Sequence, residues 1–280
     1  MFLNMMQKPS LKMILTTAIV AYALICICMW TFQRYLIYLP TANIMPPKDY
    51  GLNEFVPLNL TSKDNTHITA WYHKARNGYP TLIYFHGKGG NLENRSHYFR
   101  SLADAGFGVF GIDYRGYGAS EGNPSEEGLY QDARATMDYA SEKLALAPMQ
   151  TIIYGESIGT GVAVQIAREY PSGALILQSP FTSLQAIGEK RYPWLPVRFL
   201  LQDRFDSLSK ITDIHTPLLL IHGLQDSVVP IKEGETLFAN APDPKEAVYF
   251  PDKGHNNLDI KSRTDALIAF CKKYKLIHGE

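Results

Sequence analysis

The sequence predicts an α/β fold, in which a mainly parallel sheet carries helices on both faces. Short runs of β-branched, aliphatic and aromatic residues recur along the chain, and helical patterns separate most of them. One such run, at 151–154, leads into a G-x-S-x-G segment and then into a further helical pattern. Because alternating strands and helices favour parallel strands joined by crossover helices, we expect a parallel-rich sheet.

Length and charge narrow the class of protein. The chain has 280 residues, which is enough for one α/β domain of ordinary size plus an appendage. Its 27 Lys and Arg residues balance its 27 Asp and Glu residues, and no basic stretch predicts binding to nucleic acid. The three cysteines have no metal-type spacing and imply no disulfide framework.

An uncharged apolar run near the N-terminus predicts a membrane anchor. It covers residues 13–33, between Lys12 and Arg34, and about 20 apolar residues span a bilayer as a helix. The run is long and ends in bulky residues, which favours an uncleaved anchor over a cleaved signal peptide or a buried soluble helix. The expected organisation is a tail at 1–12, an anchor at 13–33, a linker at 34–50 and a catalytic domain at 51–280 with a short lid at about 182–215.

The charges around the anchor predict its orientation. Lys8, Lys12 and the amino terminus outnumber Arg34 in the close flanks. The positive-inside rule therefore places the N-terminus in the cytoplasm and the catalytic domain on the non-cytoplasmic side.

The elements of the domain follow from local patterns. Ser125 is a suitable N-cap for one helix, with Glu126 and Glu127 in its first turn. The first two strands are joined by the polar turn 61–65, so we expect them to form an antiparallel edge of the sheet. The predicted strands lie at 55–60, 67–73, 81–85, 107–112, 151–154, 174–178, 217–221 and 247–250. The predicted helices lie at about 91–105, 125–146, from 162 onward, 232–240 and 262–274.

Ser157 is the candidate nucleophile. It is the serine of G-x-S-x-G on a sharp turn between a strand and a helix, where Gly155 and Gly159 avoid collisions with neighbouring backbone. The N-terminus of the following helix directs its dipole at the serine oxygen. A second match at 118–122 has no strand directly before it and is followed by Asn123-Pro124, so we interpret it as a loop.

The partners of Ser157 are expected at the carboxyl ends of later strands, where active groups of parallel sheets collect. Asp226 follows the strand at 217–221, and His255 follows the strand at 247–250. We assign His255 as general base and then general acid, with Asp226 orienting its ring and stabilising the imidazolium. Such a triad requires no metal or cofactor.

Other polar residues offer alternative assignments. Asp252, Asp203 and Asp206 are alternative candidates for the acid of the triad. His222 ends a strand and is interpreted as a core residue or as support for the triad, and His86 as a residue that positions its own loop.

Acyl transfer also requires hydrogen-bond donors for the developing oxyanion. The N–H of Ile158, just after the nucleophile, is one candidate. The second is the N–H of Lys88, in the loop after the third strand, where Gly89 and Gly90 allow a close approach of the main chain. The alternative is that this loop is merely a turn.

Several segments together carry a resemblance to a known family: 32–40, 86–87, 113–118, 155–159, 179–183, 222–230 and 254–257. Through these segments the chain resembles the α/β-hydrolase superfamily, in particular its membrane-anchored serine hydrolases of the α/β-hydrolase-domain and Bem-like type, with a serine aminopeptidase-type domain. The resemblance implies an eight-stranded, mainly parallel sheet with a short lid, and the Ser-Asp-His order. One departure is Lys88-Gly89-Gly90, where such proteins usually have Asn-Ala-Gly; this change leaves the backbone donor in place.

The lid segment 191–201 is rich in aromatic and aliphatic residues. Trp194, Leu195 and Phe199 are candidates for binding an acyl chain or for facing a membrane, with ordinary packing under the loop as the alternative. The predicted function is a single-pass membrane serine hydrolase that cleaves an ester or thioester of a small-molecule, lipid or acyl-protein substrate through an acyl-enzyme on Ser157. An amidase or aminopeptidase, and a non-catalytic scaffold that binds lipid or protein, remain alternatives.

Overall fold

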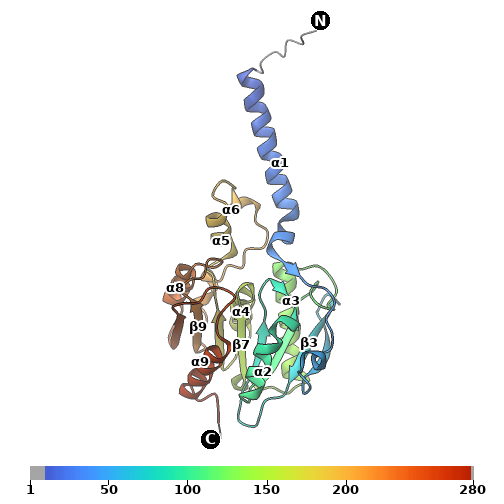
Figure 1. The fold of residues 1–280 in the computed structure, drawn as a ribbon, viewed down its shortest axis with the longest axis vertical. Helices are drawn as coiled ribbons and strands as arrows, with labels where there is room; N and C mark the ends of the chain where they lie inside the picture. The colour runs from blue at the N-terminus through green and yellow to red at the C-terminus, as the bar shows by residue number, and fades with distance from the viewer. Residues whose placement is uncertain (1–9, 279–280) are drawn as a thin grey trace.

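The computed structural model describes residues 10–278 and contains a sheet of eight strands with helices on both faces (Figure 1). The strand order is β10-β9-β8-β7-β4-β6-β3-β2. The strands are β2 Val56–Thr61, β3 His67–His73, β4 Thr81–Phe85, β6 Gly108–Asp113, β7 Thr151–Glu156, β8 Ala174–Gln178, β9 Leu218–Gly223 and β10 Lys245–Phe250. The prediction of a mainly parallel sheet is confirmed.

The antiparallel part of the sheet lies at one edge. β2 pairs antiparallel with β3, with Leu60 opposite Ile68, and β3 pairs antiparallel with β6. All remaining pairs in this sheet are parallel. The carboxyl ends of β4, β7, β9 and β10 therefore lie along one edge of the sheet, and the loops after these strands can meet there.

Alternation along the buried strands divides the core into two layers. On β4, Ile83 and Phe85 pack into one hydrophobic cluster, whereas Leu82 and Tyr84 pack into the other. Helices α3 Glu126–Glu142, α4 Ile158–Glu169 and α8 Ile231–Asn240 cover the first face, and α2 Ser96–Asp104 and α9 Ile260–Lys273 cover the second. The side chains of β4 are fully buried on both faces, as expected for a central parallel strand.

The helix α1, Leu11–Ile37, stands away from the sheet, and it is long and apolar enough to cross a membrane (Figure 1). Ser10 caps it by accepting a hydrogen bond from the N–H of Met13. The helix is longer than the predicted anchor at 13–33, since it includes Arg34 and continues to Ile37. Residues 1–9 of the predicted tail lie outside the described residues.

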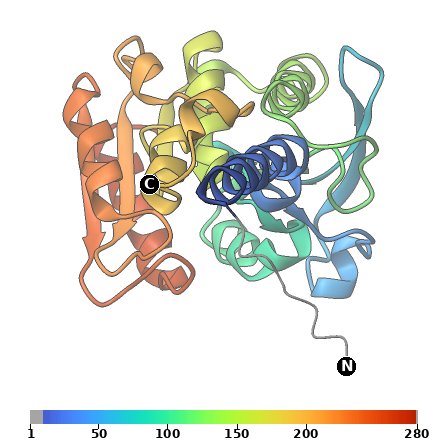
Figure 2. The same cartoon turned by 90° about the horizontal axis from the view of Figure 1, so that it is seen from above.

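The lid contains helices that the sequence patterns did not predict. They are α5 Leu184–Arg191, α6 Val197–Leu200 and α7 Leu208–Ile211. Viewed from above, α1 stands beside this lid over the middle of the domain (Figure 2). After α1 the chain forms β1, Leu39–Pro40, which pairs in parallel with β5, Gly89–Gly90.

Candidate active site

Ser157 has a backbone conformation that side chains rarely adopt. Its φ is 53° and its ψ is −118°, between the end of β7 and the start of α4. A Cβ added to Gly159 would lie 2.1 Å from the carbonyl oxygen of Phe85, and one added to Gly155 would lie 2.5 Å from the carbonyl oxygen of Gly159. The two glycines therefore allow β4, β7 and α4 to approach closely enough to hold the strained turn.

The structure brings Ser157, His255 and Asp226 into one hydrogen-bonded chain. The Oγ of Ser157 lies 2.9 Å from Nε2 of His255, and Nδ1 of His255 lies 2.7 Å from Oδ2 of Asp226. The three side chains come from the ends of β7, β9 and β10, which are separated in sequence but share one edge of the sheet.

Asp226 is held as an acceptor of hydrogen bonds. Its Oδ1 accepts from the N–H groups of Val228 and Val229, at 2.9 and 2.8 Å. Burial raises its pKa, but hydrogen bonds from His222 and His255 outweigh burial, and the net pKa lies well below its usual value. The carboxylate is therefore ionised at neutral pH and can stabilise a charged His255.

His222 supports this carboxylate from within the core. It is fully buried, and its Nε2 lies 2.9 Å from the carbonyl oxygen of Val229 and 3.3 Å from Oδ2 of Asp226. A donor role towards the carbonyl requires the proton on Nε2. The predicted role of His222 as core or supporting residue agrees with these contacts.

The loop after β4 lies against the nucleophile. A Cβ on Gly87 would lie 3.4 Å from Cβ of Ser157. His86 contacts this loop, since its Nδ1 lies 2.7 Å from the carbonyl oxygen of Gly87. Burial lowers the pKa of His86 to about 3, so its ring is neutral at pH 7. Lys88 and Ile158, the two predicted oxyanion donors, line the same cavity as Ser157.

The cavity over Ser157 has a volume of about 630 Å³, which is within the range of small-molecule sites. Its walls are mainly apolar and come from α1, the lid and the loop after β9. Leu195 lines this cavity, and its role in binding an acyl chain stays a prediction. Trp194 and Phe199 lie outside its lining and are 55% and 82% exposed, so an acyl-binding role for them has no contact to support it here.

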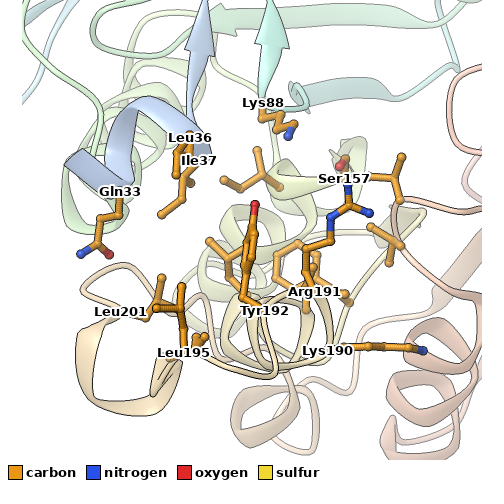
Figure 3. Close-up of a pocket in the computed structure, with 18 of the residues that line it drawn as sticks. Gln33, Leu36, Ile37, Lys88, Ser157, Lys190, Arg191, Tyr192, Leu195 and Leu201 are labelled. Carbon is orange, nitrogen blue, oxygen red and sulfur yellow. The ribbon is translucent and has the colours of Figure 1, made fainter. Parts of the chain in front are cut away.

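One wall of the cavity was missed by sequence reasoning. Met29, Gln33, Leu36 and Ile37 of α1 contribute to the lining. Figure 3 shows the α1 residues Gln33, Leu36 and Ile37 across the cavity from Tyr192, Leu195 and Leu201 of the lid. A polar residue inside an otherwise apolar span, Gln33, was the available signal, because such a residue needs partners within the protein.

An ion pair adjoins the nucleophile in the chain: Glu156, the residue before Ser157, is partly buried, and its partner Arg95 is buried. Nε of Arg95 lies 3.2 Å from Oε2 of Glu156, and Tyr84 donates to the same oxygen at 2.7 Å. Burial opposes ionisation of Glu156, but the charge of Arg95 and the hydrogen bonds from Tyr84 and Arg95 lower its pKa to about 2. Sequence reasoning missed this pair, although a charged residue next to Ser157 in the turn was a visible signal.

The structure does not support the three alternative candidates for the acid of the triad. Asp203 pairs with Arg34 at 2.9 Å and accepts a hydrogen bond from Tyr38, so it joins the domain to α1. Asp206 accepts from the N–H of Ser209, and Asp252 is exposed on its loop. None of the three is hydrogen-bonded to His255, whose Nδ1 is bonded to Asp226.

The second G-x-S-x-G match is a loop. The Oγ of Ser120 donates to the carbonyl oxygen of Asp113 at 2.7 Å and accepts from the N–H of Thr69 at 2.8 Å. These bonds fasten the loop to β3 and β6, as the sequence context indicated.

Comparisons with known proteins identify the family of the chain. A family model described as serine aminopeptidase matches residues 79–201. The chain is 37% identical over 273 residues to an uncharacterized protein of Mycobacterium tuberculosis, covering 96% of this chain and 97% of that one. It is 34% identical over 204 residues to human alpha/beta hydrolase domain-containing protein 17B, covering 72% of this chain and 69% of that one.

Solved structures show the same fold. An esterase of Pyrococcus furiosus superposes with a TM-score of 0.69 at 20% identity, covering 85% of this chain and 98% of that one. An acetyl xylan esterase of Paenibacillus superposes with a TM-score of 0.66 at 21% identity, covering 81% and 86%. From its fold and its relatives, the chain belongs to the α/β-hydrolase superfamily.

Proposed function

We propose that this protein is a membrane-anchored serine hydrolase that cleaves carboxylic ester or thioester bonds. The observation that carries the proposal is the chain of 2.9 and 2.7 Å contacts from Ser157 through His255 to Asp226, at the base of an apolar cavity. The two short contacts place a proton acceptor on the serine hydroxyl and a carboxylate behind that acceptor.

The proposed reaction has two steps, acylation of Ser157 and hydrolysis of the acyl-enzyme. Ser157 Oγ attacks the carbonyl carbon while its proton passes to Nε2 of His255, and the oxygen or sulfur of the leaving group then departs with that proton. This leaves an acyl group on Ser157. Water, deprotonated by His255, attacks the acyl carbon, and the proton returns to Ser157 as the carboxylic acid is released.

Residues around Ser157 are suited to stabilise the oxyanion and to bind the acyl part of the substrate. We assign the N–H groups of Lys88 and Ile158 as donors to the oxyanion, where each such donor is worth about 3 kcal/mol of barrier. The apolar walls of the cavity are suited to the acyl part of the substrate. An amide substrate requires the same groups, so the bond type is decided by experiment.

The membrane part of the proposal depends on α1. This helix has 27 residues, and the described part of the chain contains one such candidate span. We assign it as a single transmembrane anchor, with the catalytic domain on the non-cytoplasmic side.

A fluorophosphonate probe tests the function directly. The wild-type protein should label at Ser157, and Ser157→Ala should not label. The second arm measures hydrolysis of p-nitrophenyl esters from short to long chains, beside thioester and amide analogues. Labelling without turnover of any ester or thioester would refute the proposal, and faster turnover of amides would favour the peptidase alternative.

A further inference from the structure

One face of α1 is built into the catalytic domain. Tyr22, Cys26, Met29, Gln33 and Ile37 recur every three or four residues and therefore share one side of the helix. Within α1, Gln33 is buried, Cys26, Met29 and Ile37 are partly buried, and the other residues are exposed. The same face supplies Met29, Gln33 and Ile37 to the cavity over Ser157.

Polar contacts fix the lid alongside this face. The hydroxyl of Tyr22 donates to the carbonyl oxygen of Trp194 at 2.8 Å. Nε2 of Gln33 donates to the carbonyl oxygen of Leu200 at 3.0 Å, and Oε1 of Gln33 accepts from the N–H of Gln202 at 2.9 Å. The lid is thus bonded to α1 at two levels, eleven residues or about 16 Å apart along the helix.

The length of α1 then limits where the bilayer lies. The hydrocarbon core is about 30 Å thick and requires about 20 helical residues. Beyond Tyr22 only residues 11–21 of the described helix stand clear of the lid, and they extend about 16 Å. If α1 crosses the bilayer, the lid must be immersed beside it.

The surface of the lid fits this position. Trp194 is 55% exposed and Phe199 is 82% exposed, and neither is needed to line the cavity. Exposed aromatic side chains are typical of protein surfaces at a membrane interface. These exposed apolar side chains belong to the lid that Tyr22 and Gln33 bond to α1, whose own outer face is exposed and apolar.

The charges in the cavity are all of one sign. Lys88, Lys190 and Arg191 line it, and its lining contains no carboxylate. Among residues 10–278 these three cations form no ion pair with an acidic side chain. Figure 3 shows Lys88 and Arg191 on the side of the cavity where Ser157 lies. An anionic group close to the scissile bond would neutralise these cations.

We propose that the substrate is an anionic acyl amphiphile of the bilayer, such as a phosphate-bearing lipid ester. Its acyl chain enters sideways between α1 and the immersed lid, while Lys88 and Arg191 bind its anionic group. This inference rests on the proposed function, because it specifies the substrate of the same Ser157 site.

Depth-dependent quenching tests the immersion of the lid. The full-length protein is reconstituted in vesicles that contain lipids brominated on their acyl chains, which quench tryptophan fluorescence. The Trp194 signal is the difference in fluorescence between wild type and Trp194→Phe. The difference spectrum corrects for Trp30 on α1 and for the buried Trp71. Strong quenching of this signal is expected. Quenching no greater than in vesicles of unbrominated lipid would overturn the immersion.

A matched pair of variants tests the role of the lid in turnover. Phe199→Glu places a charge on the lid, and Met149→Glu places one on another exposed apolar residue, 65% exposed, in the 3-10 turn Pro148–Gln150 before β7. Phe199→Glu should lower hydrolysis of a vesicle-borne long-chain ester at least tenfold more than hydrolysis of soluble p-nitrophenyl butyrate. Met149→Glu should change neither. Equal losses on both substrates, or no loss on either, would overturn the proposal.

The charge of the substrate is tested with phosphatidylglycerol and phosphatidylcholine of identical chains. The wild type should hydrolyse the anionic lipid at least tenfold faster, and Arg191→Gln should reduce that preference. No preference between the two lipids would overturn the anionic assignment. If p-nitrophenyl butyrate is hydrolysed but neither lipid is, this inference fails while the proposed function survives; if none is hydrolysed, the proposed function fails as well.

Discussion

Ser157 has a strained backbone, and its hydroxyl lies within hydrogen-bonding distance of His255. A φ of 53° is unfavourable for a serine, and the surrounding strand and helix hold it only because Gly155 and Gly159 have no side chain. The strain exposes Oγ to His255 on one side and to the cavity on the other. The local backbone is therefore part of the proposed chemistry.

Replacing Asp226 by Asn should disable this arrangement without unfolding the protein. The amide offers no negative charge to the imidazolium and favours the wrong tautomer of His255, so kcat should fall by about 10⁴-fold. KM for a p-nitrophenyl ester should change little, since Asp226 lies behind the histidine. Steady-state kinetics measure both values, and a loss confined to KM would contradict the assignment.

The Glu156–Arg95 pair predicts how stability depends on pH. The folded pKa of Glu156, about 2, is below its usual 4.5, so its contribution to stability is complete above pH 4.5 and is lost as the pH falls towards 2. Arg95→Met leaves a partly buried carboxylate without its cation and should cost about 2 kcal/mol at pH 7. Because burial then favours the neutral acid, the difference from wild type should shrink below pH 4.5.

Chemical denaturation at several pH values measures this effect. Lys261→Met is the control, because the side chain of Lys261 is 84% exposed and the loss of its charge should leave stability unchanged. A difference between Arg95→Met and wild type that is the same at pH 3 and pH 7 would contradict the assigned ionisation of Glu156.

The packing of α4 against β4 depends on one missing side chain. A methyl group at Gly159 would lie 2.1 Å from the carbonyl oxygen of Phe85, so Gly159→Ala should force α4 away and cost at least about 2 kcal/mol. Gly89→Ala is the matched control, since its Cβ has nothing within 4 Å. Thermal unfolding compares the two, and equal midpoints would show that α4 adapts without cost.

The strands and the order Ser157, Asp226, His255 were predictable because they depend on local patterns. Apolar runs define strands, and in a parallel sheet the residues after them meet at one edge. The residues that line the cavity and support the site were harder to predict from the sequence. Gln33 meets Leu200 and Gln202 across more than 160 residues of chain, and Arg95 meets Glu156 across 61. Periodicity in the sequence does not predict which polar residues will form hydrogen bonds or ion pairs with each other when they are far apart in the chain.

The short helices of the lid were missed for a related reason. α6 has four residues and α5 has eight, so neither repeats an apolar pattern for long enough to be recognised. α6 packs against α1 and α5 packs against α6, so tertiary contacts rather than a repeated local pattern place these short helices.

The orientation of the whole molecule is open to a direct test. The positive charges before the apolar run 13–33 predict that the catalytic domain lies outside the cytoplasm. Protease added to intact, sealed cells or right-side-out vesicles should therefore digest the domain, whereas inverted vesicles should protect it. A cytoplasmic reporter enzyme provides the control for leakage, and protection in right-side-out vesicles would reverse the assigned topology.

The short pairing of β1 with β5 links the end of α1 to the loop that carries Lys88. The N–H of Leu39, two residues after α1 ends, donates to the carbonyl oxygen of Lys88 at 2.9 Å, and the hydroxyl of Tyr117 donates to the same oxygen. A hydrophobic helix in a bilayer of unmatched thickness tilts. Because this tilt would pull on the peptide next to the proposed oxyanion donor, turnover of even a water-soluble ester should vary with the chain length of the surrounding lipid, which makes membrane thickness a determinant of rate.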